Sequence, residues 1–141
     1  MFIRNQLAAW LSLMMLTVAQ LPTLLVAQDK ERLKFEVYQD AAQEFRWRLK
    51  AGNGEVLATP GQGYKAKTDC QKGVERIKQE ADKLAFEVYE DNSNEVRWRA
   101  KAANGQVVAT SSQGYKTKAD CEKAIDLIRK GAAKSDVKDK T

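Results

Sequence analysis

The strongest constraint on the fold of this 141-residue chain is an internal repeat. Phe35 and Trp47 return as Phe86 and Trp98, each 51 positions later, and the intervening residues align without a gap. A fixed period of this length indicates that each copy is one supersecondary unit that packs against its neighbour. We therefore expect two copies of one small fold rather than two unrelated domains.

Hydrophobic alternation predicts three strands in the first copy. Residues 35–38 and 44–50 alternate apolar and polar side chains, as half-buried strands do. Asn53-Gly54 is typical of a two-residue type I′ hairpin turn, so residues 56–59 would form the returning strand. Asn104-Gly105 and residues 107–110 repeat this pattern in the second copy.

A two-residue turn would fix which side chains share a face of the sheet. Lys50 would pair with Leu57, and Leu49 would pair with Ala58. The expected inner face holds Phe45, Trp47, Leu49, Val56 and Ala58, with Val96, Trp98, Ala100, Val107 and Ala109 in the second copy. The expected outer face holds Arg46, Arg48, Lys50, Leu57 and Thr59, with Arg97, Arg99, Lys101, Val108 and Thr110 in the second copy.

A helix is predicted after each hairpin, at about residues 67–80 in the first copy. Apolar residues there recur at helical spacing and would cover the tryptophan face of the sheet. They are Cys70, Val74, Ile77 and Ala81, and then Cys121, Ile125, Ile128 and Ala132. Thr117 with Asp120 resembles a capping box, whereas Ala66 leaves the first helix less well capped. Residues 134–141 are polar and fit either a short edge strand or a frayed tail.

The two cysteines occupy equivalent positions on these helical stripes, which favours free, buried thiols. A disulfide between them is permitted in an exported protein if both lie beside a pseudo-two-fold axis. The chain contains no C-x-x-C motif and no histidine. The sequence therefore supports neither a thioredoxin-like redox site nor a zinc finger, and it predicts no metal and no cofactor.

The N-terminus differs from the rest of the chain. Arg4 is the only charged residue before Asp29, and an apolar run begins at Leu7, which is typical of a secretory signal peptide. We expect cleavage after Ala27, with Ala19 as a second candidate, and a periplasmic or extracellular location. The alternative is an uncleaved membrane anchor, although Pro22 interrupts the apolar run. The expected organisation is a signal peptide at 1–27, a first repeat at 28–83 and a second at 84–141, integrated into one domain.

Several motifs together resemble the YegP-like family of small bacterial and archaeal domains of unknown function. They are Phe-Glu-Val-Tyr, the stretch from Phe45 to Glu55, Gly-Tyr-Lys-x-Lys and the end of the helix at residues 73–78. The resemblance covers residues 33–131 and implies an α+β fold of two tandem β-β-β-α-β repeats. These would merge by exchange of their last strands into one antiparallel sheet with two helices on one face. The exported N-terminus and the cysteines depart from the family pattern.

The sequence bears on three classes of function: an enzyme, a structural protein and a binding module. Without histidine, a Cys–His or Ser–His catalytic pair is impossible, so we expect no enzyme and no catalytic residues. We expect an exported, non-catalytic module that binds a macromolecule, and the alternative is a structural or self-associating envelope protein. The mild excess of 24 basic over 19 acidic residues does not by itself argue for nucleic acid.

The candidate partner-binding surface is the outer sheet face, where basic residues alternate with aromatic ones. We predict that Arg46, Arg48, Lys50, Arg97, Arg99 and Lys101, with Tyr38 and Tyr89, contact an anionic component of the cell envelope. The competing interpretation is that Glu36, Glu44, Glu87 and Glu95 pair with these cations across strands and leave an ordinary solvated surface. In either case we expect a monomer with internal pseudo-two-fold symmetry, which would contact a membrane only through an uncleaved signal.

Overall fold

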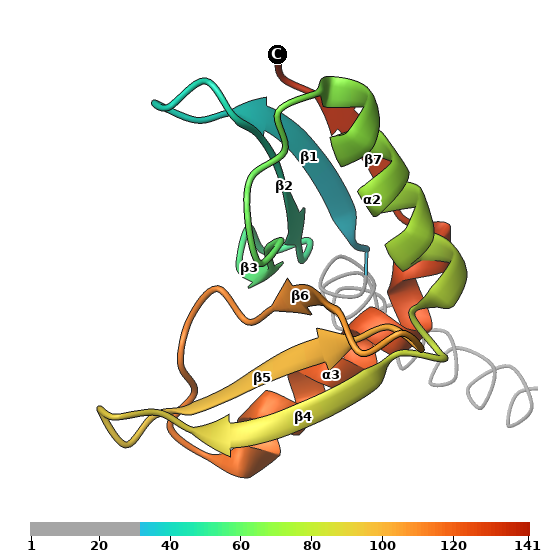
Figure 1. Cartoon of the computed structure of the whole chain (residues 1–141). Helices are drawn as coiled ribbons and strands as arrows, with labels where there is room; N and C mark the ends of the chain where they lie inside the picture. The colour runs from blue at the N-terminus through green and yellow to red at the C-terminus, as the bar shows by residue number, and fades with distance from the viewer. Residues whose placement is uncertain (1–31) are drawn as a thin grey trace, which may run out of the picture.

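The structure, a computed structural model, describes residues 32–141. The expected signal peptide at residues 1–27 lies outside this range. Two similar β-β-β-α units follow one another, and a last strand closes the chain (Figure 1). The elements are β1 (Lys34–Gln39), β2 (Phe45–Lys50), β3 (Val56–Ala58), α2 (Lys67–Glu80), β4 (Ala85–Glu90), β5 (Val96–Lys101), β6 (Val107–Thr110), α3 (Lys118–Gly131), the 3₁₀ turn η1 (Ala132–Lys134) and β7 (Asp136–Asp139).

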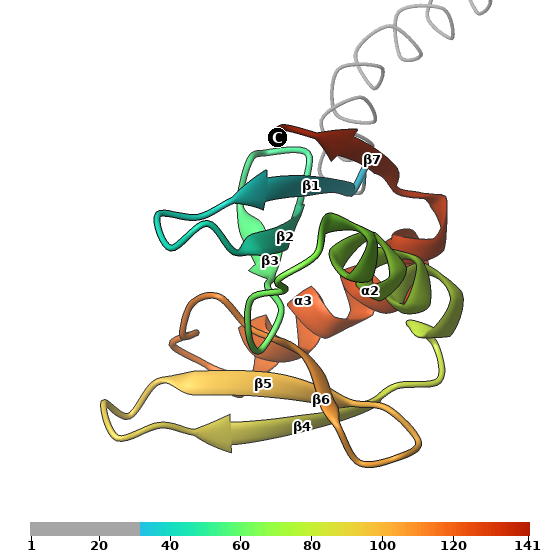
Figure 2. The ribbon, with the colours of Figure 1, turned by 45° about the horizontal axis from the view of Figure 1, so that its top comes forward.

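The seven strands form two sheets, with the orders β3-β2-β1-β7 and β4-β5-β6. Helix α2 packs on β1 and β2, and helix α3 packs on β4 and β5, so each helix covers the strands of its own repeat (Figure 2). Strand β7 crosses from the second repeat and pairs with β1, in the parallel direction. The α+β class and the tandem repeats are confirmed, and the end of the chain is an edge strand rather than a frayed tail.

The expected single antiparallel sheet with both helices on one face differs from this arrangement. Between residues 32 and 141, one antiparallel bridge joins the two sheets, between Thr59 and Thr110, and the Ser112 hydroxyl donates to the carbonyl oxygen of Val56 in β3. Each repeat carries a register shift between β2 and β3 or between β5 and β6, at Leu49/Lys50 and at Ala100/Lys101. Such bulges increase the local twist of a sheet. We attribute the separation into two sheets to this twist and to the shortness of β3 and β6.

The hairpin turn also differs from the predicted two-residue turn. The amide of Gly54 donates to the carbonyl of Ala51, and the amide of Ala51 donates to Glu55, so the loop has three residues. Gly54 has a φ of 88°, whereas Asn53 is not in the left-handed region. This is a type I turn closed by a glycine in the left-handed conformation, the next commonest hairpin connection.

The longer loop changes which side chains enter the core. Lys50 pairs with Val56 instead of Leu57, and Leu57 is buried. In the second repeat Lys101 pairs with Val107, which is 41% exposed although it was expected on the inner face. The prediction of which side chains of β3 and β6 face the core is therefore wrong at Leu57 and at Val107. Those of β2 and β5 alternate as predicted.

The core lies between each helix and its sheet. Trp47 and Trp98 are fully buried, and each packs edge-on against the phenylalanine of the preceding strand, Phe35 or Phe86. The cysteines are free and buried, as predicted. The side chain of Thr117 caps α3 by accepting a hydrogen bond from Asp120, whereas Ala66 provides no side-chain cap for α2. Between residues 32 and 141, no helix combines the length and hydrophobicity needed to cross a bilayer.

Candidate binding cleft

In the first repeat, two of the three predicted basic residues, Arg48 and Lys50, gather around one buried carboxylate. Glu36 on β1 is 4% exposed, and its Oε1 lies 3.0 Å from Arg48 Nε and 2.8 Å from Lys50 Nζ. Its Oε2 lies 2.5 Å from Lys140 Nζ, just after β7. Burial alone would raise the pKa of Glu36, but the hydrogen bonds from Lys140, Lys50 and Arg48 outweigh it and lower the pKa to about 2. These cations are therefore committed to a structural ion-pair cluster.

The second repeat has the same arrangement, but between residues 32 and 141 no third cation pairs with its glutamate. Glu87, at the position equivalent to Glu36, lies 2.7 Å from Arg99 Nε and 3.0 Å from Lys101 Nζ. Hydrogen bonds from Arg99 and Lys101 lower the pKa of Glu87. However, the side chain of Glu87 is 42% exposed and that of Arg99 is 45% exposed. Exposed pairs of this kind contribute little to stability and can exchange partners. Arg99 is thus more available than Arg48.

The remaining two arginines hold turns in place. Asp40 accepts hydrogen bonds from the amides of Ala42 and Glu44 through Oδ1, and Arg46 Nε lies 2.7 Å from its Oδ2. Asp91 and Arg97 repeat this arrangement at 2.6 Å. Arg46 and Arg97 therefore have a structural role that the sequence analysis missed. The same six-residue spacing from aspartate to arginine in both copies is the signal that could have shown it.

Both tyrosines of the predicted surface lie under arginines. The guanidinium carbon of Arg48 is 4.6 Å from the ring centroid of Tyr38, and that of Arg99 is 5.1 Å from that of Tyr89. Each pair lies on a different sheet, so the eight predicted residues are divided between the two sheets. The competing interpretation, cross-strand pairing with carboxylates, describes most of them well.

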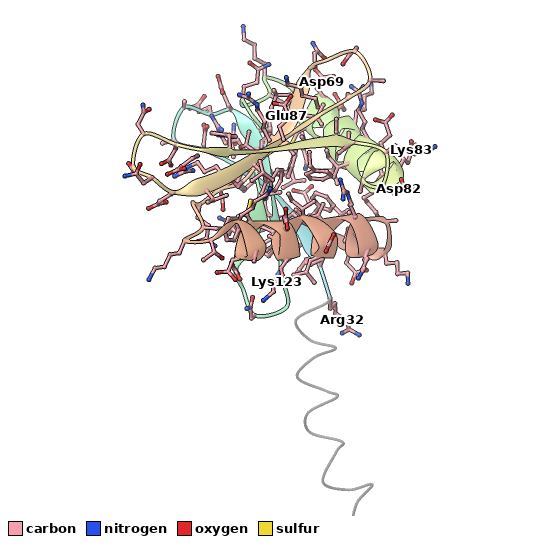
Figure 3. All side chains as sticks on the ribbon, turned by 90° about the horizontal axis from the view of Figure 1, so that it is seen from below. Arg32, Asp69, Asp82, Lys83, Glu87 and Lys123 are labelled. Atoms are coloured by element: carbon pink, nitrogen blue, oxygen red, sulfur yellow. The ribbon has the colours of Figure 1, made fainter. Side chains whose placement is uncertain are left out.

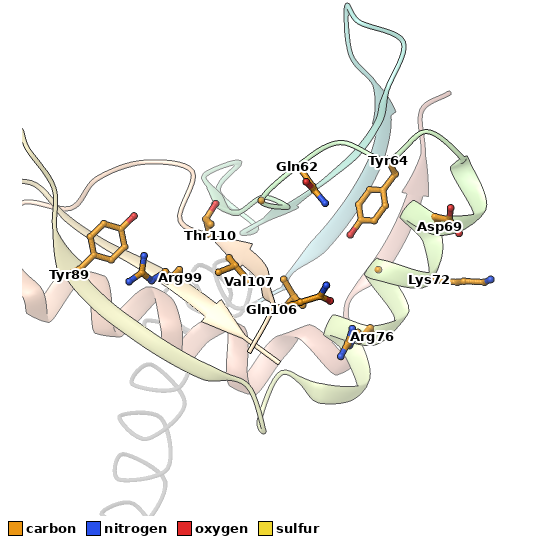
Figure 4. A pocket seen from close by; sticks show the side chains of 13 residues that line it. Gln62, Tyr64, Asp69, Lys72, Arg76, Tyr89, Arg99, Gln106, Val107 and Thr110 are labelled. Carbon is orange, nitrogen blue, oxygen red and sulfur yellow. The ribbon is translucent and has the colours of Figure 1, made fainter. Parts of the chain in front are cut away.

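One cleft nevertheless brings part of this surface together with the other repeat. It has a volume of about 710 Å³ and lies between α2, the loop before it and the outer face of the second sheet (Figure 4). Tyr89 and Arg99 line one side, and Lys72 and Arg76 on α2 line the other. Gln62, Tyr64, Asp69, Gln106 and Thr110 complete the polar lining.

The charge of the cleft is predominantly positive. Three basic side chains line it, from Lys72, Arg76 and Arg99, against one acidic side chain, from Asp69. Arg76 pairs with Glu80 at 3.2 Å, and Arg99 pairs with Glu87, but neither glutamate lines the cleft. Within residues 32–141, no carboxylate oxygen lies within ion-pair distance of Lys72. The cleft can therefore offer positive charge and hydrogen-bond donors to an anion without loss of an existing Lys72 contact.

A close approach of backbone to ring shapes one wall of the cleft. Tyr64 lies over Gly73 of α2, where an added Cβ would be 2.6 Å from the tyrosine hydroxyl oxygen. The second repeat has alanine at the equivalent position, Ala124, and its tyrosine, Tyr115, is buried. Burial raises the pKa of Tyr115 to about 12. Glycine thus lets Tyr64 pack against α2 at the edge of the cleft.

The described residues give no sign of a metal centre. Between residues 32 and 141, no three potential ligands among histidine, cysteine, aspartate and glutamate are clustered. Both thiols lie in the core, where burial raises the pKa of Cys70 to about 11 and also raises that of Cys121. The chemistry available at the cleft is that of ammonium, guanidinium, phenol, amide and hydroxyl groups and of the one carboxylate of Asp69.

Comparison with known proteins identifies the family. Residues 40–86 and 91–139 each match a domain of unknown function, DUF1508. The chain belongs to the DUF1508 family. The two matches begin 51 residues apart and so follow the internal repeat. The resemblance to the YegP-like family is thereby confirmed, because relatives of this chain include YegP itself.

The similarity to some relatives extends over both repeats. A UPF0339 protein from the 5′ region of the ptx operon of Stutzerimonas stutzeri is 40% identical over 99 residues, which cover 70% of this chain and 87% of that protein. The UPF0339 protein YegP of Escherichia coli is 32% identical over 108 residues, or 76% of this chain and 96% of YegP. Neither name states an activity.

Solved structures share the fold. The solution NMR structure of the E. coli protein of unknown function yegP matches with a TM-score of 0.69 and 29% identity, over 78% of this chain and 94% of that one. The solution NMR structure of a UPF0339 protein from Shewanella oneidensis matches with a TM-score of 0.68 and 27% identity, over 76% and 90% of the two chains. The tandem DUF1508 fold is therefore shared with experimentally determined structures.

Sequence reasoning found two of the cleft residues, Tyr89 and Arg99, and missed those on α2. Lys72 and Arg76 lie on the polar side of a helix in the other repeat, and nothing in their local pattern separates them from ordinary solvated lysines and arginines. Only the packing of the two DUF1508 repeats places them opposite Arg99.

Proposed function

We propose that this protein is an exported, non-catalytic binding module that holds an anionic group of a cell-envelope macromolecule in the cleft between α2 and the second sheet. The observation that carries the proposal is the presence of Lys72, Arg76 and Arg99 in one cleft of about 710 Å³ that is built by both repeats. Tyr64 and Tyr89 add aromatic rings and hydroxyl groups to this lining.

The chemistry of the cleft fits an anion better than it fits a reaction. The guanidinium group of Arg99 can donate to phosphate, sulfate or carboxylate oxygens, and Lys72 adds a mobile positive charge. In contrast, a general acid or base needs a pKa near neutrality. Among residues 32–141, the carboxylates with a lowered pKa are held by cations, and the thiols with a raised pKa are buried.

Binding can be tested with three anionic probes on residues 28–141. They are dextran sulfate, vesicles that contain an anionic lipid, and single-stranded DNA, each titrated at low and at physiological salt. We expect dextran sulfate or the vesicles to bind, with an affinity that falls steeply as salt rises because counterions are released. If none of the three probes binds at low salt, the proposal is wrong.

A pair of matched variants tests whether the cleft carries the binding. Lys72→Gln should weaken it by about tenfold, which corresponds to about 1.4 kcal/mol. Lys123→Gln changes the equivalent residue on α3, which projects from the outer side of that helix and does not line the cleft (Figure 3). The Lys123 variant should bind like the unaltered protein. Equal losses in both variants would indicate nonspecific attraction.

Export requires a separate measurement. Mass spectrometry of the native protein should show an N-terminus near Gln28. Intact Met1 in a soluble cytoplasmic fraction would contradict export but would leave anion binding by the cleft to be decided by the titrations.

A further inference from the structure

Strand β7 shows how an extended segment binds to one repeat of this fold. It lies parallel to β1, with Val137 opposite Phe35, Lys138 opposite Glu36 and Asp139 opposite Val37. The amide of Lys140 donates to the carbonyl oxygen of Val37 at 2.8 Å. The edge of β1 is thus covered by a segment whose own four residues are all exposed, so main-chain pairing contributes much of the contact.

Two ion pairs fix the position of this segment. Lys140 binds Glu36, and Asp139 binds Lys67 at the start of α2. Under this cover, Phe35 is 0% exposed and Val37 is 1% exposed. The side chains that hold the segment are therefore an aspartate and the lysine that follows it, whereas Val137 is 43% exposed.

The equivalent edge in the second repeat has no such cover. Within residues 32–141, β4 pairs with β5 alone, and no strand lies along its other edge. Phe86 and Val88 are only partly buried, although Phe86 packs on Trp98 in the same way as Phe35 packs on Trp47. Together with Ile125 and Arg129 of α3 they line a groove of about 260 Å³.

The fixed period explains why this edge is free. The residues equivalent to β7 in the first repeat are 85–88, and these form the first part of β4 itself. The segment that would cover the edge of β4 is thus β4 itself, and a strand cannot pair with its own edge. Within the described residues, the edges of β1 and β4 are equivalent, and β7 is the one strand that can cover either of them.

The groups that hold β7 all recur at the free edge. Phe86 is equivalent to Phe35, and Glu87 is equivalent to Glu36. Lys118 at the start of α3 is equivalent to Lys67. Glu87 is 42% exposed where Glu36 is 4% exposed, and within residues 32–141 no cation takes the place that Lys140 has at Glu36. Glu122 and Asp126 add negative charge along the groove, and Arg129 lies 4.9 Å from the centre of the Phe86 ring at one side.

We propose that the free edge of β4 binds an extended segment of a partner protein, parallel to β4, with an aspartate opposite Val88 and a lysine directly after it. The segment adds a fourth strand to the second sheet, a known mode of peptide recognition in which main-chain hydrogen bonds give affinity and side chains give specificity. The site is separate from the cleft and does not depend on the function proposed for it.

A synthetic peptide with the sequence of residues 134–141 is the probe, because the protein already binds this segment at β1. Titration into the protein, followed by NMR, should shift the signals of Phe86, Val88 and Ile125. The signals of Phe35 and Val37 should stay in place, because the tethered β7 has a high effective concentration at its own site. A peptide with Lys138→Glu and Lys140→Glu should bind at least about tenfold more weakly.

Two variants of the protein locate the site. Val88→Pro removes the amide that, by analogy with Val37, faces the free edge, and it should abolish peptide binding. Glu87→Gln leaves the core untouched and should weaken peptide binding severalfold. Glu90→Gln, on the same strand, should leave it unchanged and is the matched control. The folding of each variant is checked by circular dichroism, and Glu87→Gln decides the matter if the proline variant does not fold.

Three results would overturn the proposal. The first is the absence of any shift of the NMR signals at the highest concentration at which the peptide is soluble. The second is a shift of Phe35 and Val37 instead of Phe86 and Val88, which would mean exchange with β7. The third is self-association of the protein alone that Val88→Pro abolishes, because a second copy would then occupy the edge.

Discussion

Thr59 and Thr110 hydrogen-bond to each other through both of their backbone groups. The amide of Thr59 donates to the carbonyl of Thr110 at 3.0 Å, and the amide of Thr110 donates to that of Thr59 at 2.9 Å. The two residues are equivalent in the two repeats. An antiparallel pair of equivalent residues lies on the axis that relates the copies, so this bridge marks the pseudo-two-fold axis of the protein.

The bridge gives the first prediction. Thr110→Pro removes one amide donor of the bridge and should lower the free energy of unfolding by about 1–3 kcal/mol, since the carbonyl of Thr59 loses its partner. Thr110→Val keeps both backbone hydrogen bonds and should cost less than about 0.5 kcal/mol. Urea denaturation measures both values. Equal stability of the two variants would show that the bridge contributes nothing.

The second prediction concerns the dependence of the first repeat on β7. Residues 29–83 expressed alone lack this strand, so Phe35 and Val37 would be exposed at the edge of β1. We expect the isolated repeat to dimerise or to remain unfolded, because small single sheets without cover are marginal. Analytical ultracentrifugation and circular dichroism distinguish these states from a stable monomer, which would contradict the prediction.

Much of this architecture could be predicted from local pattern. The strands around Trp47 and Trp98 follow strict alternation, and the helices follow the spacing of the cysteines and isoleucines with a Thr117 cap. The predicted length of the hairpin loop was wrong because Asn53-Gly54 fits either the centre of a two-residue turn or the end of a three-residue loop. The choice depends on how β2 pairs with β3, which the dipeptide does not determine.

The contacts between the repeats could not be predicted in the same way. The parallel pairing of β7 with β1 brings Lys140 to Glu36, residues more than a hundred positions apart. Likewise, the cleft joins Lys72 to Arg99 through packing of one repeat on the other. Side chains with an ordinary local pattern acquire a role only through these long-range contacts.

The third prediction is a pH dependence that originates at Glu36. Its pKa is lowered to about 2, so its contribution to stability is complete above the ordinary carboxyl pKa and is lost as the pH falls toward 2. A shift of this size corresponds to on the order of 3 kcal/mol. Glu36→Gln should therefore destabilise the protein at pH 7, and the difference from the unaltered protein should shrink as the pH falls from about 5 to 2.

The control for Glu36 is its equivalent in the second repeat. Glu87→Gln removes a largely exposed carboxylate and should have a much smaller effect on the free energy of unfolding at pH 7. Urea denaturation at a series of pH values measures both variants. Parallel curves for the Glu36 variant and the unaltered protein over the whole acid range would contradict the assignment.

The fourth prediction concerns the thiols. Burial raises the pKa of Cys70 to about 11 and raises that of Cys121, so both are protonated at neutral pH and shielded from solvent. A maleimide reagent should label them slowly in the native protein and rapidly in denaturant, since the thiolate is the reactive form. Rapid labelling of the native protein, or a mass that lacks two hydrogens, would be inconsistent with free, buried thiols.

The last prediction tests the contact between Gly73 and Tyr64. Alanine is normally favoured over glycine inside a helix by about 1 kcal/mol. At Gly73, however, the new Cβ would lie 2.6 Å from the Tyr64 hydroxyl oxygen and 3.2 Å from Cζ, so Gly73→Ala should stabilise the protein less than this or destabilise it. The double variant Gly73→Ala with Tyr64→Phe removes the closest clash and should recover the helix-propensity gain. In the second repeat, Ala124→Gly should cost at least about 1 kcal/mol, since no such contact requires glycine there.

Because Tyr64 lines the cleft, Gly73→Ala should also weaken binding of whichever anionic probe the protein accepts, whereas Ala124→Gly should not. Additive effects of the Gly73 and Tyr64 substitutions would show that the two residues do not interact.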